Sequence, residues 1–255
     1  MTHAPWRGRI FTAIWVVALL AVFLLPYAQV SWWSFAASTA ALLALAWLRW
    51  GGAALRRLGL PVEPASIAWT VAAGLALYAL FRLVVVPSVA AREALTLTPY
   101  PPRIAVSFVF QTLNEELVLG ALLVIGLARW TRRPILTVLV VAGLFALLHL
   151  LLYRYGTIGL DLLPVTLATL AAVGVIRGAA ILLAGHVGFA WALHAAFNLT
   201  MFAGRWRETS SGRVLQEPEI LDAFLRPPWI VLPAAVVAVL LVGLLRRVGP
   251  RYARV

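Results

Sequence analysis

The sequence contains no cysteine and no lysine, and charged residues make up only 12% of its 255 residues. Without cysteine there is no disulfide framework, no thiol nucleophile and no cysteine metal site. The 21 basic residues are all arginines and outnumber 9 acidic ones, so the net charge is +12. Hydrophobic residues make up 63% of the chain. An ordinary soluble domain is excluded, because it could not cover so much apolar surface.

A basic balance often indicates nucleic-acid binding. In this chain the arginines gather in short loops at the ends of apolar runs. Retention of such loops on the cytoplasmic side and attraction to anionic headgroups account for that placement. We therefore expect no nucleic-acid partner, and we expect membrane lipid around the protein.

Several apolar runs reach the length of a bilayer span and alternate with short loops that carry arginine. This pattern predicts an all-α, polytopic integral membrane protein with about eight transmembrane helices that enclose a polar cavity. We expect one transmembrane domain over residues 1–255, with a motif-bearing core at about 104–203. The expected spans are residues 10–27, 31–49, 66–89, 104–128, 135–153, 160–183, 186–203 and 229–246.

The first of these runs resembles a signal peptide, but it is longer than a usual apolar core and no A-x-A site follows it. We interpret it as an uncleaved first span. With the amino terminus in the cytoplasm, thirteen arginines fall on the side of the termini and seven on the other side. The positive-inside rule then predicts that both termini are cytoplasmic.

Two adjacent glutamates, Glu115 and Glu116, lie near the middle of the apolar segment 108–128. An acidic side chain at the centre of a spanning helix costs about 2.5 to 3.5 kcal/mol on insertion scales. Adjacent helix positions differ by about 100° around the axis, so the two carboxylates should have different neighbours. Gln111 shares a face with Glu115. The segment predicts a functional site in which one carboxylate lines a cavity and the other anchors the helix.

Two later spans carry histidines with a second side chain one turn away. Phe145 precedes His149 by four residues, and an aromatic ring in that position can hold the imidazole and keep water away. His194 precedes Asn198 by four residues, so an imidazole and an amide lie on one face, where both offer N–H donors to a single oxygen. Together with a carboxylate base, these groups are the parts needed to hydrolyse an acyl bond.

Other polar residues in the spans have simpler explanations. His186 lies at a span end, and we expect a structural role for it. Arg82 and Arg177 are expected to be charge partners or snorkelling residues. Gly174 and Gly178 form a G-x-x-x-G pair, which predicts a close contact between helices.

The order Glu-Glu, then Phe-x-x-x-His, then His-x-x-x-Asn on separate spans resembles the CPBP family of intramembrane proteases, which includes the CAAX prenyl proteases and bacterial Abi-type proteins. The resemblance covers about residues 111–201. It implies that Glu115, with His149, activates a water for attack on a peptide carbonyl. It also implies that His194 and Asn198 form an oxyanion hole.

In the same resemblance Glu116 is a supporting second carboxylate and Phe145 supports His149. The implied substrate is a peptide or protein near the membrane surface, possibly lipidated, and no cofactor is implied. The expected location is the cytoplasmic membrane of a bacterium or archaeon.

The chain departs from the family pattern at one position. The first motif usually reads Glu-Glu-x-x-x-Arg, whereas Gly120 stands here in place of the arginine. Two explanations follow: Glu116 is protonated, or an arginine from another span, Arg82 or Arg177, supplies the missing charge.

Two alternatives to this protease stay open at the level of the sequence. Glu and two His residues are plausible zinc ligands, although there is no H-E-x-x-H motif and an amide is a poor zinc ligand, so zinc is not favoured. A non-enzymatic protein is the second alternative, either an immunity or scaffolding protein or a small transporter in which the buried polar groups bind a partner or relay protons.

Overall fold

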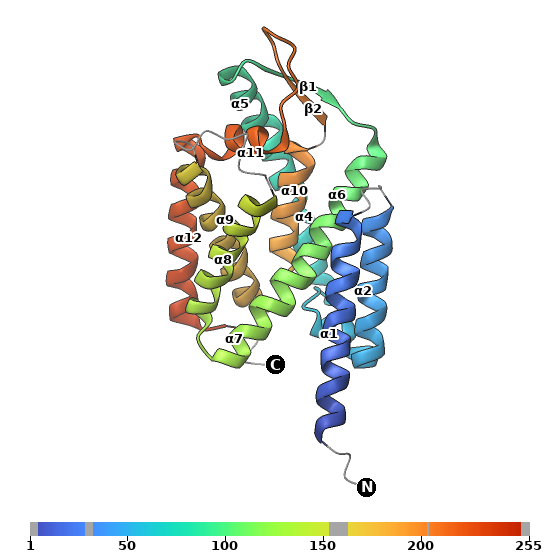
Figure 1. Ribbon diagram of the computed structural model, residues 1–255. Coiled ribbons are helices and arrows are strands. Elements are labelled where there is room, and N and C mark those ends of the chain that lie inside the picture. The colour runs from blue at the N-terminus through green and yellow to red at the C-terminus, as the bar shows by residue number, and fades with distance from the viewer. Residues whose placement is uncertain (1–4, 29–32, 153–162, 203, 251–255) are drawn as a thin grey trace.

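The computed structural model describes residues 5–28, 33–152, 163–202 and 204–250. Residues 153–162, which include Arg154 and Asp161, lie outside these ranges. The described chain is mostly helical, and its long helices run roughly parallel to one another (Figure 1).

Each of the eight expected spans coincides with a helix or with a continuous series of helical segments. These are α1 (Pro5–Ala28), α2 (Ser34–Trp50), α4–η2–α5 (Pro64–Leu80, Phe81–Val85, Val86–Arg92), α6–η3–α7 (Pro102–Glu115, Glu116–Ile125, Gly126–Thr131), α8 (Pro134–Leu152), α9 (Leu163–Ala184), α10 (Gly188–Met201) and α12 (Pro228–Val248). Short helices η1 (Gly51–Ala53), α3 (Ala54–Arg57) and α11 (Glu217–Leu225) lie in the connections.

Within the described residues, four helices are long and apolar enough to cross a membrane by length and composition. They are Pro64–Arg92, Pro102–Thr131, Pro164–Ala184 and Pro228–Val248. Two further apolar stretches, Ile14–Pro26 and Pro134–His149, are shorter. The helical membrane architecture is as expected, whereas the count of eight spanning helices is not confirmed.

Two of the long helices contain a π-helical segment, in which backbone hydrogen bonds join residues five apart rather than four apart. One is η2, which contains Arg82, and the other is η3, which begins at Glu116. Proline occupies the first turn of α4, α6 and α12. That position suits proline, because its missing N–H would have no partner in the helix.

The close contact predicted from Gly174 and Gly178 joins α9 to α8. A Cβ added at Gly174 would lie 2.9 Å from the Cα of Ala142, and one at Gly178 would lie 3.4 Å from the side chain of Val138. The two glycines therefore let the backbones of α8 and α9 approach more closely than larger residues would allow. This contact fixes the position along the helix axis at which Arg177, between the two glycines, faces α8.

The stretch 204–228, which lies between the last two expected spans, contains a strand and a helix. Strand β2 (Gly204–Glu208) pairs with β1 (Leu95–Pro99) as a two-stranded antiparallel sheet. We call β1, β2 and α11 the cap. Trp206 anchors the cap, because its fully buried indole donates a hydrogen bond of 2.7 Å to the carbonyl of Met201 at the end of α10.

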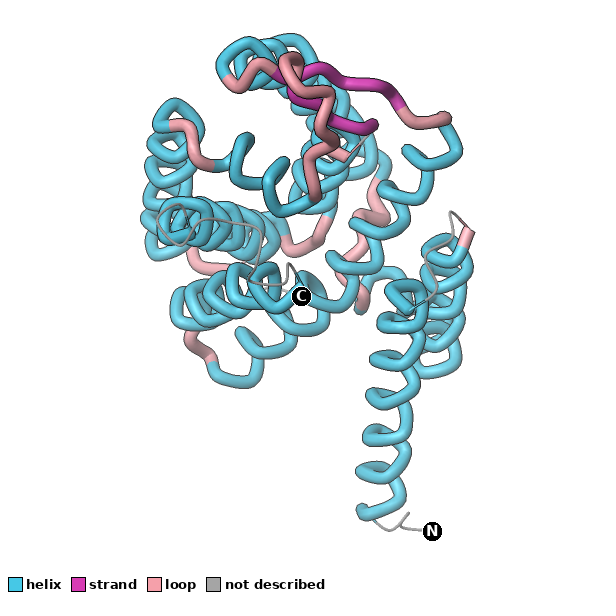
Figure 2. Tube along the Cα trace, turned by 45° about the horizontal axis from the view of Figure 1, so that its top comes forward, coloured by secondary structure: helices cyan, strands magenta, loops and turns pink. Residues whose placement is uncertain are grey.

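The cap lies at one end of the helices, and the start of α1 and the end of α12 lie at the other end (Figure 1). Figure 2 shows that α1 and α2 form a pair on the periphery, beside the long helix α6–η3–α7. That long helix crosses between the α1–α2 pair and α8, α9 and α12, which places Glu115 and Glu116 in the interior.

Candidate active site

The helix that carries the two glutamates is anchored by the residue before them. Asn114 is fully buried, and its side-chain amide donates a hydrogen bond of 3.2 Å to the carbonyl of Phe35 on α2. Thr39 on α2 donates a hydrogen bond of 2.5 Å to the side-chain oxygen of Asn114. Buried polar groups in lipid need such partners. The pairing therefore fixes the rotation of α6 where the carboxylates begin.

Glu116 is fully buried and binds two partners from two other helices. Its Oε1 forms an ion pair with the guanidinium of Arg177 on α9 and accepts a hydrogen bond of 3.0 Å from Nδ1 of His194 on α10. Because a buried charge without a partner is costly, this pairing explains how the carboxylate tolerates the interior. The expected anchoring role of Glu116 corresponds to these contacts.

Glu115 lies on a more open side of the same helix. Its side chain is 14% exposed, and its Oε1 accepts a hydrogen bond of 3.2 Å from Nε2 of Gln111, as the shared helix face predicted. The other oxygen, Oε2, lies 3.6 Å from Nε2 of His194. The prediction that the glutamates have different neighbours is therefore only partly correct, since both approach the same imidazole from opposite sides of its ring.

The helix with His194 and Asn198 is tied to α6 near the glutamates. The indole of Trp191 on α10 donates a hydrogen bond of 3.2 Å to the carbonyl of Val109 on α6. His194 and Asn198 are both buried, at 8% and 7% exposure. Within the described part of the chain, no hydrogen bond joins the Asn198 side chain to another residue. The expected paired-donor face is present on α10.

His149 lies near the end of α8 and is held by Phe145 through both its backbone and its ring. The Nδ1 of His149 lies 2.8 Å from the carbonyl of Phe145, and the two ring centroids are 4.4 Å apart in an edge-on arrangement. Because a carbonyl only accepts, Nδ1 carries the proton and the lone pair lies on Nε2. The ring of Phe145 also lies 6.3 Å from the ring of His194, in an edge-on arrangement.

An arginine from another helix takes the place of the arginine that the first motif lacks. Arg177 supplies the positive charge to Glu116, as one of the two explanations predicted. A Cβ at Gly120 would lie 2.8 Å from Oε2 of Glu116 and 2.9 Å from Cδ1 of Ile181, so a longer side chain fits there only if the ends of these two flexible side chains move. The guanidinium carbon of Arg177 also lies 4.3 Å from the ring centroid of Phe145.

His186 and Arg82 were also expected to have structural roles, and the structure shows contacts of that kind for His186 alone of the two. His186 has the structural role expected of it, since its Nδ1 accepts a hydrogen bond of 3.1 Å from the N–H of Gly188 where α10 begins. Arg82, on η2, makes no ion pair with any of the residues that the structure describes. It is therefore not the arginine that replaces the motif charge.

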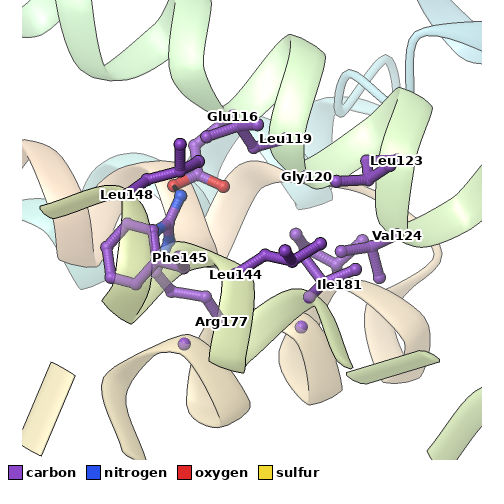
Figure 3. Close-up of a pocket in the computed structure, with 13 residues that line it drawn as sticks. Glu116, Leu119, Gly120, Leu123, Val124, Leu144, Phe145, Leu148, Arg177 and Ile181 are labelled. Atoms are coloured by element: carbon purple, nitrogen blue, oxygen red, sulfur yellow. Dashed lines mark ion pairs between the residues drawn. The ribbon is translucent and has the colours of Figure 1, made fainter. Parts of the chain in front are cut away.

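A cavity of about 120 Å³ lies between η3, α8 and α9, with Glu116 and Arg177 at one end (Figure 3). The rest of its lining is apolar or glycine: Leu119, Gly120, Leu123, Val124, Val141, Leu144, Phe145, Leu148, Gly174, Gly178 and Ile181. The sequence predicted that one carboxylate lines a cavity and the other anchors the helix, whereas Glu116 does both and Glu115 is not part of this lining. The carboxylate at this cavity is Glu116.

Across the described ranges, no group of three or more His, Cys, Asp or Glu residues is arranged so that it could hold a metal ion. Hydrogen bonds and ion pairs instead join Gln111, Glu115, His194, Glu116 and Arg177. Asn198 lies one turn from His194 on α10, and the ring of Phe145 contacts the ring of His149. Such a set can hold a proton, accept one from water and donate hydrogen bonds to a developing anion.

Comparison with known proteins was made on the whole chain. No curated protein and no solved structure matches it significantly. A family model described as type II CAAX prenyl endopeptidase Rce1-like matches residues 97–200. The match contains Glu115, Glu116, Phe145, His149 and both residues of the His-x-x-x-Asn motif. The resemblance drawn from the three motifs is thus confirmed by this match, which makes residues 97–200 similar to Rce1-like type II CAAX prenyl endopeptidases.

Proposed function

We propose that the protein is an intramembrane endopeptidase of the CPBP type that hydrolyses a peptide bond with an activated water. The observation that carries the proposal is the position of His194 between the carboxylates. Its Nδ1 bonds to the buried Glu116 at 3.0 Å, and its Nε2 faces the more exposed Glu115 at 3.6 Å. This arrangement separates a structural carboxylate from one that can meet water.

Glu115 is the proposed general base. It takes a proton from a water molecule while the water oxygen forms a bond to the substrate carbonyl carbon. Its accessible carboxylate suits that task better than Glu116, which has no exposed surface. His149, with its lone pair on Nε2, is the proposed second acceptor for the water. The carbon–nitrogen bond then breaks, and the proton passes to the leaving amine.

His194 and Asn198 are the proposed oxyanion donors. Glu116 is paired with Arg177 and is therefore ionised, so the Nδ1 of His194 carries the proton that bonds to it. Donation from Nε2 to an oxyanion then requires a second proton, which makes His194 an imidazolium. The nearby Glu115 carboxylate balances that charge. Donors held in a dry site stabilise a developing oxyanion more than donors in water do.

Glu116 and Arg177 are proposed to position His194 rather than to touch the substrate. The proposed reaction needs no metal, because a carboxylate base and two neutral or cationic donors carry the charges. A chelator such as EDTA should therefore leave cleavage unchanged, whereas loss of activity that added zinc restores would contradict this part of the proposal.

The proposed substrate is a peptide bond in a protein close to the membrane surface, possibly with a lipid attached. The start of α1, the end of α2, α7 and the end of α12 lie at one end of the molecule (Figure 1). These segments carry the arginines Arg7, Arg9, Arg49, Arg129, Arg246 and Arg247. By the positive-inside rule we propose that this end is cytoplasmic and that the cap is external.

The test is cleavage of a quenched peptide library, with and without a prenyl group, by purified protein in liposomes. Glu115→Gln, His149→Ala and His194→Ala should each reduce kcat by about 100-fold or more, as loss of an acid–base or oxyanion group does. His186→Ala is the matched control, since its imidazole accepts a hydrogen bond at the start of α10 and is not one of the proposed catalytic groups, and it should retain activity. Equal activity in all four variants would refute the proposal.

A further inference from the structure

Two buried side-chain atoms in the described part of the chain have no hydrogen-bond partner. They are Oε2 of Glu116 and Nε of Arg177. Both residues are almost completely buried, at 0% and 5% exposure, and both line the cavity between η3, α8 and α9. Buried polar atoms in native proteins nearly always have a partner, so two orphans at one cavity point to an occupant.

The approach to Glu116 from the cavity is open because residue 120 is a glycine. A Cβ at this position would lie 2.8 Å from Oε2 of Glu116. Any larger side chain would therefore cover that oxygen. In Figure 3 the carboxylate and the guanidinium lie together at one end of the cavity, and the apolar side chains of Leu144 and Ile181 lie away from them.

The cavity has an apolar wall that reaches the outer surface of the helices. Leu144 and Leu148, one turn apart on α8, both line it and are 45% and 40% exposed. On a helix that lies in the membrane, exposed leucines face hydrocarbon. An occupant can therefore enter sideways from the bilayer without crossing a polar surface.

The polar end restricts the head group of that occupant. Glu116 and Arg177 already neutralise each other, so a charged head would leave an uncompensated charge in a low-dielectric site. The head must also donate to Oε2 and accept from Nε–H. A hydroxyl is the smallest neutral group that does both.

A single water could bond to both orphan atoms, which gives it the minimum of two polar partners. It would leave most of the cavity unfilled, because the other lining residues are apolar or glycine. At about 120 Å³ the cavity is close in size to an engineered apolar cavity of about 150 Å³ that binds benzene. It therefore has room for a short apolar segment behind the head group.

We infer that the cavity between η3, α8 and α9 is a binding site for the hydroxyl end of an apolar molecule from the bilayer, that is, a lipid alcohol. The hydroxyl donates to Glu116 Oε2 and accepts from Arg177 Nε, and the chain runs past Leu144 and Leu148 into the membrane. This site differs from the proposed peptide site, which lies on the side of Glu115 and Asn198.

The test is photolabelling of the purified protein in micelles with an octanol that carries a diazirine on its chain, followed by peptide mapping. Labels are expected on η3, α8 and α9. Octanol should compete about 25-fold better than octane at equal mole fraction in the micelle, because each of two hydrogen bonds contributes about fivefold. Octylammonium should compete poorly.

Leu144→Trp narrows the opening of the cavity toward the membrane. It should abolish the part of the photolabelling that octanol suppresses. Leu147→Trp is the matched control, because Leu147 is exposed on the same helix, at 55%, and does not line the cavity. Labelling spread over all lipid-facing helices would overturn the inference. Equal competition by octane would overturn the role of the hydroxyl, and unchanged labelling in Leu144→Trp would overturn the location.

Discussion

Removing Arg177, the positively charged partner of the Glu116 carboxylate, should destabilise the protein strongly. In the variant Arg177→Met the carboxylate keeps no exposed surface but loses its guanidinium partner, and only the hydrogen bond to His194 stays. Removal of one partner from a buried ion pair costs about 3 to 5 kcal/mol, because the other charge is left uncompensated. For a chain of this size, each kcal/mol lowers the apparent Tm by about 2 to 4 °C. We therefore expect a decrease of about 6 to 20 °C.

The assay is thermal unfolding of the detergent-solubilised protein, followed by tryptophan fluorescence. Arg82→Met is the matched control, since Arg82 has no ion pair with the described residues, and it should shift the apparent Tm by no more than about 2 °C. Gly120→Arg in the Arg177→Met background restores the charge from the motif position. It should recover at least half of the loss, whereas Gly120→Arg alone should be crowded by Glu116 and Ile181.

Two results would refute this reasoning. If Arg177→Met unfolds within about 2 °C of the wild type, the ion pair does not hold the buried carboxylate. If the double variant is no more stable than Arg177→Met, the arginine at position 177 does not replace the arginine of the motif.

The other predictions concern helix packing and the cap. Gly174→Leu should separate α8 from α9 and cost about 1 to 3 kcal/mol, since even a Cβ would lie 2.9 Å from the backbone of Ala142. A Cβ at Gly143 on α8 meets no atom within 4 Å, so Gly143→Leu is the control in the same unfolding assay. On the cap, Arg213 holds the pKa of the Glu208 carboxyl below its usual range by hydrogen bonding. Because the folded pKa is the lower one, the pair stabilises the cap above the ordinary carboxyl pKa, and this stabilisation is lost as pH falls through the folded pKa. In Arg213→Gln the NMR titration midpoint of Glu208 should rise toward the ordinary value, and an unchanged midpoint would contradict the pairing.

The positions of the helices and of the motifs could be predicted because the signals are local. Apolar runs of bilayer length locate the segments, and four-residue spacing places His194 with Asn198 and Phe145 with His149 on shared faces. The number of spanning helices was less certain, because hydropathy does not distinguish a full span from a shorter buried helix such as α10. The cap was missed, since β1 and β2 pair across about a hundred residues of sequence and neither has a hairpin signal.

The sequence by itself determined that this is a helical membrane protein, which residues are the candidates for the chemistry, and that the motif arginine is missing at Gly120. Periodicity, apolar length and motif order suffice for these conclusions, because each depends on residues close together in the chain. Only the tertiary structure decided that Arg177, rather than Arg82, pairs with Glu116, and that His194 lies between both glutamates. Those contacts join α6, η3, α9 and α10, and they depend on how closely the glycines let helices approach and how each helix is rotated, which local sequence does not specify.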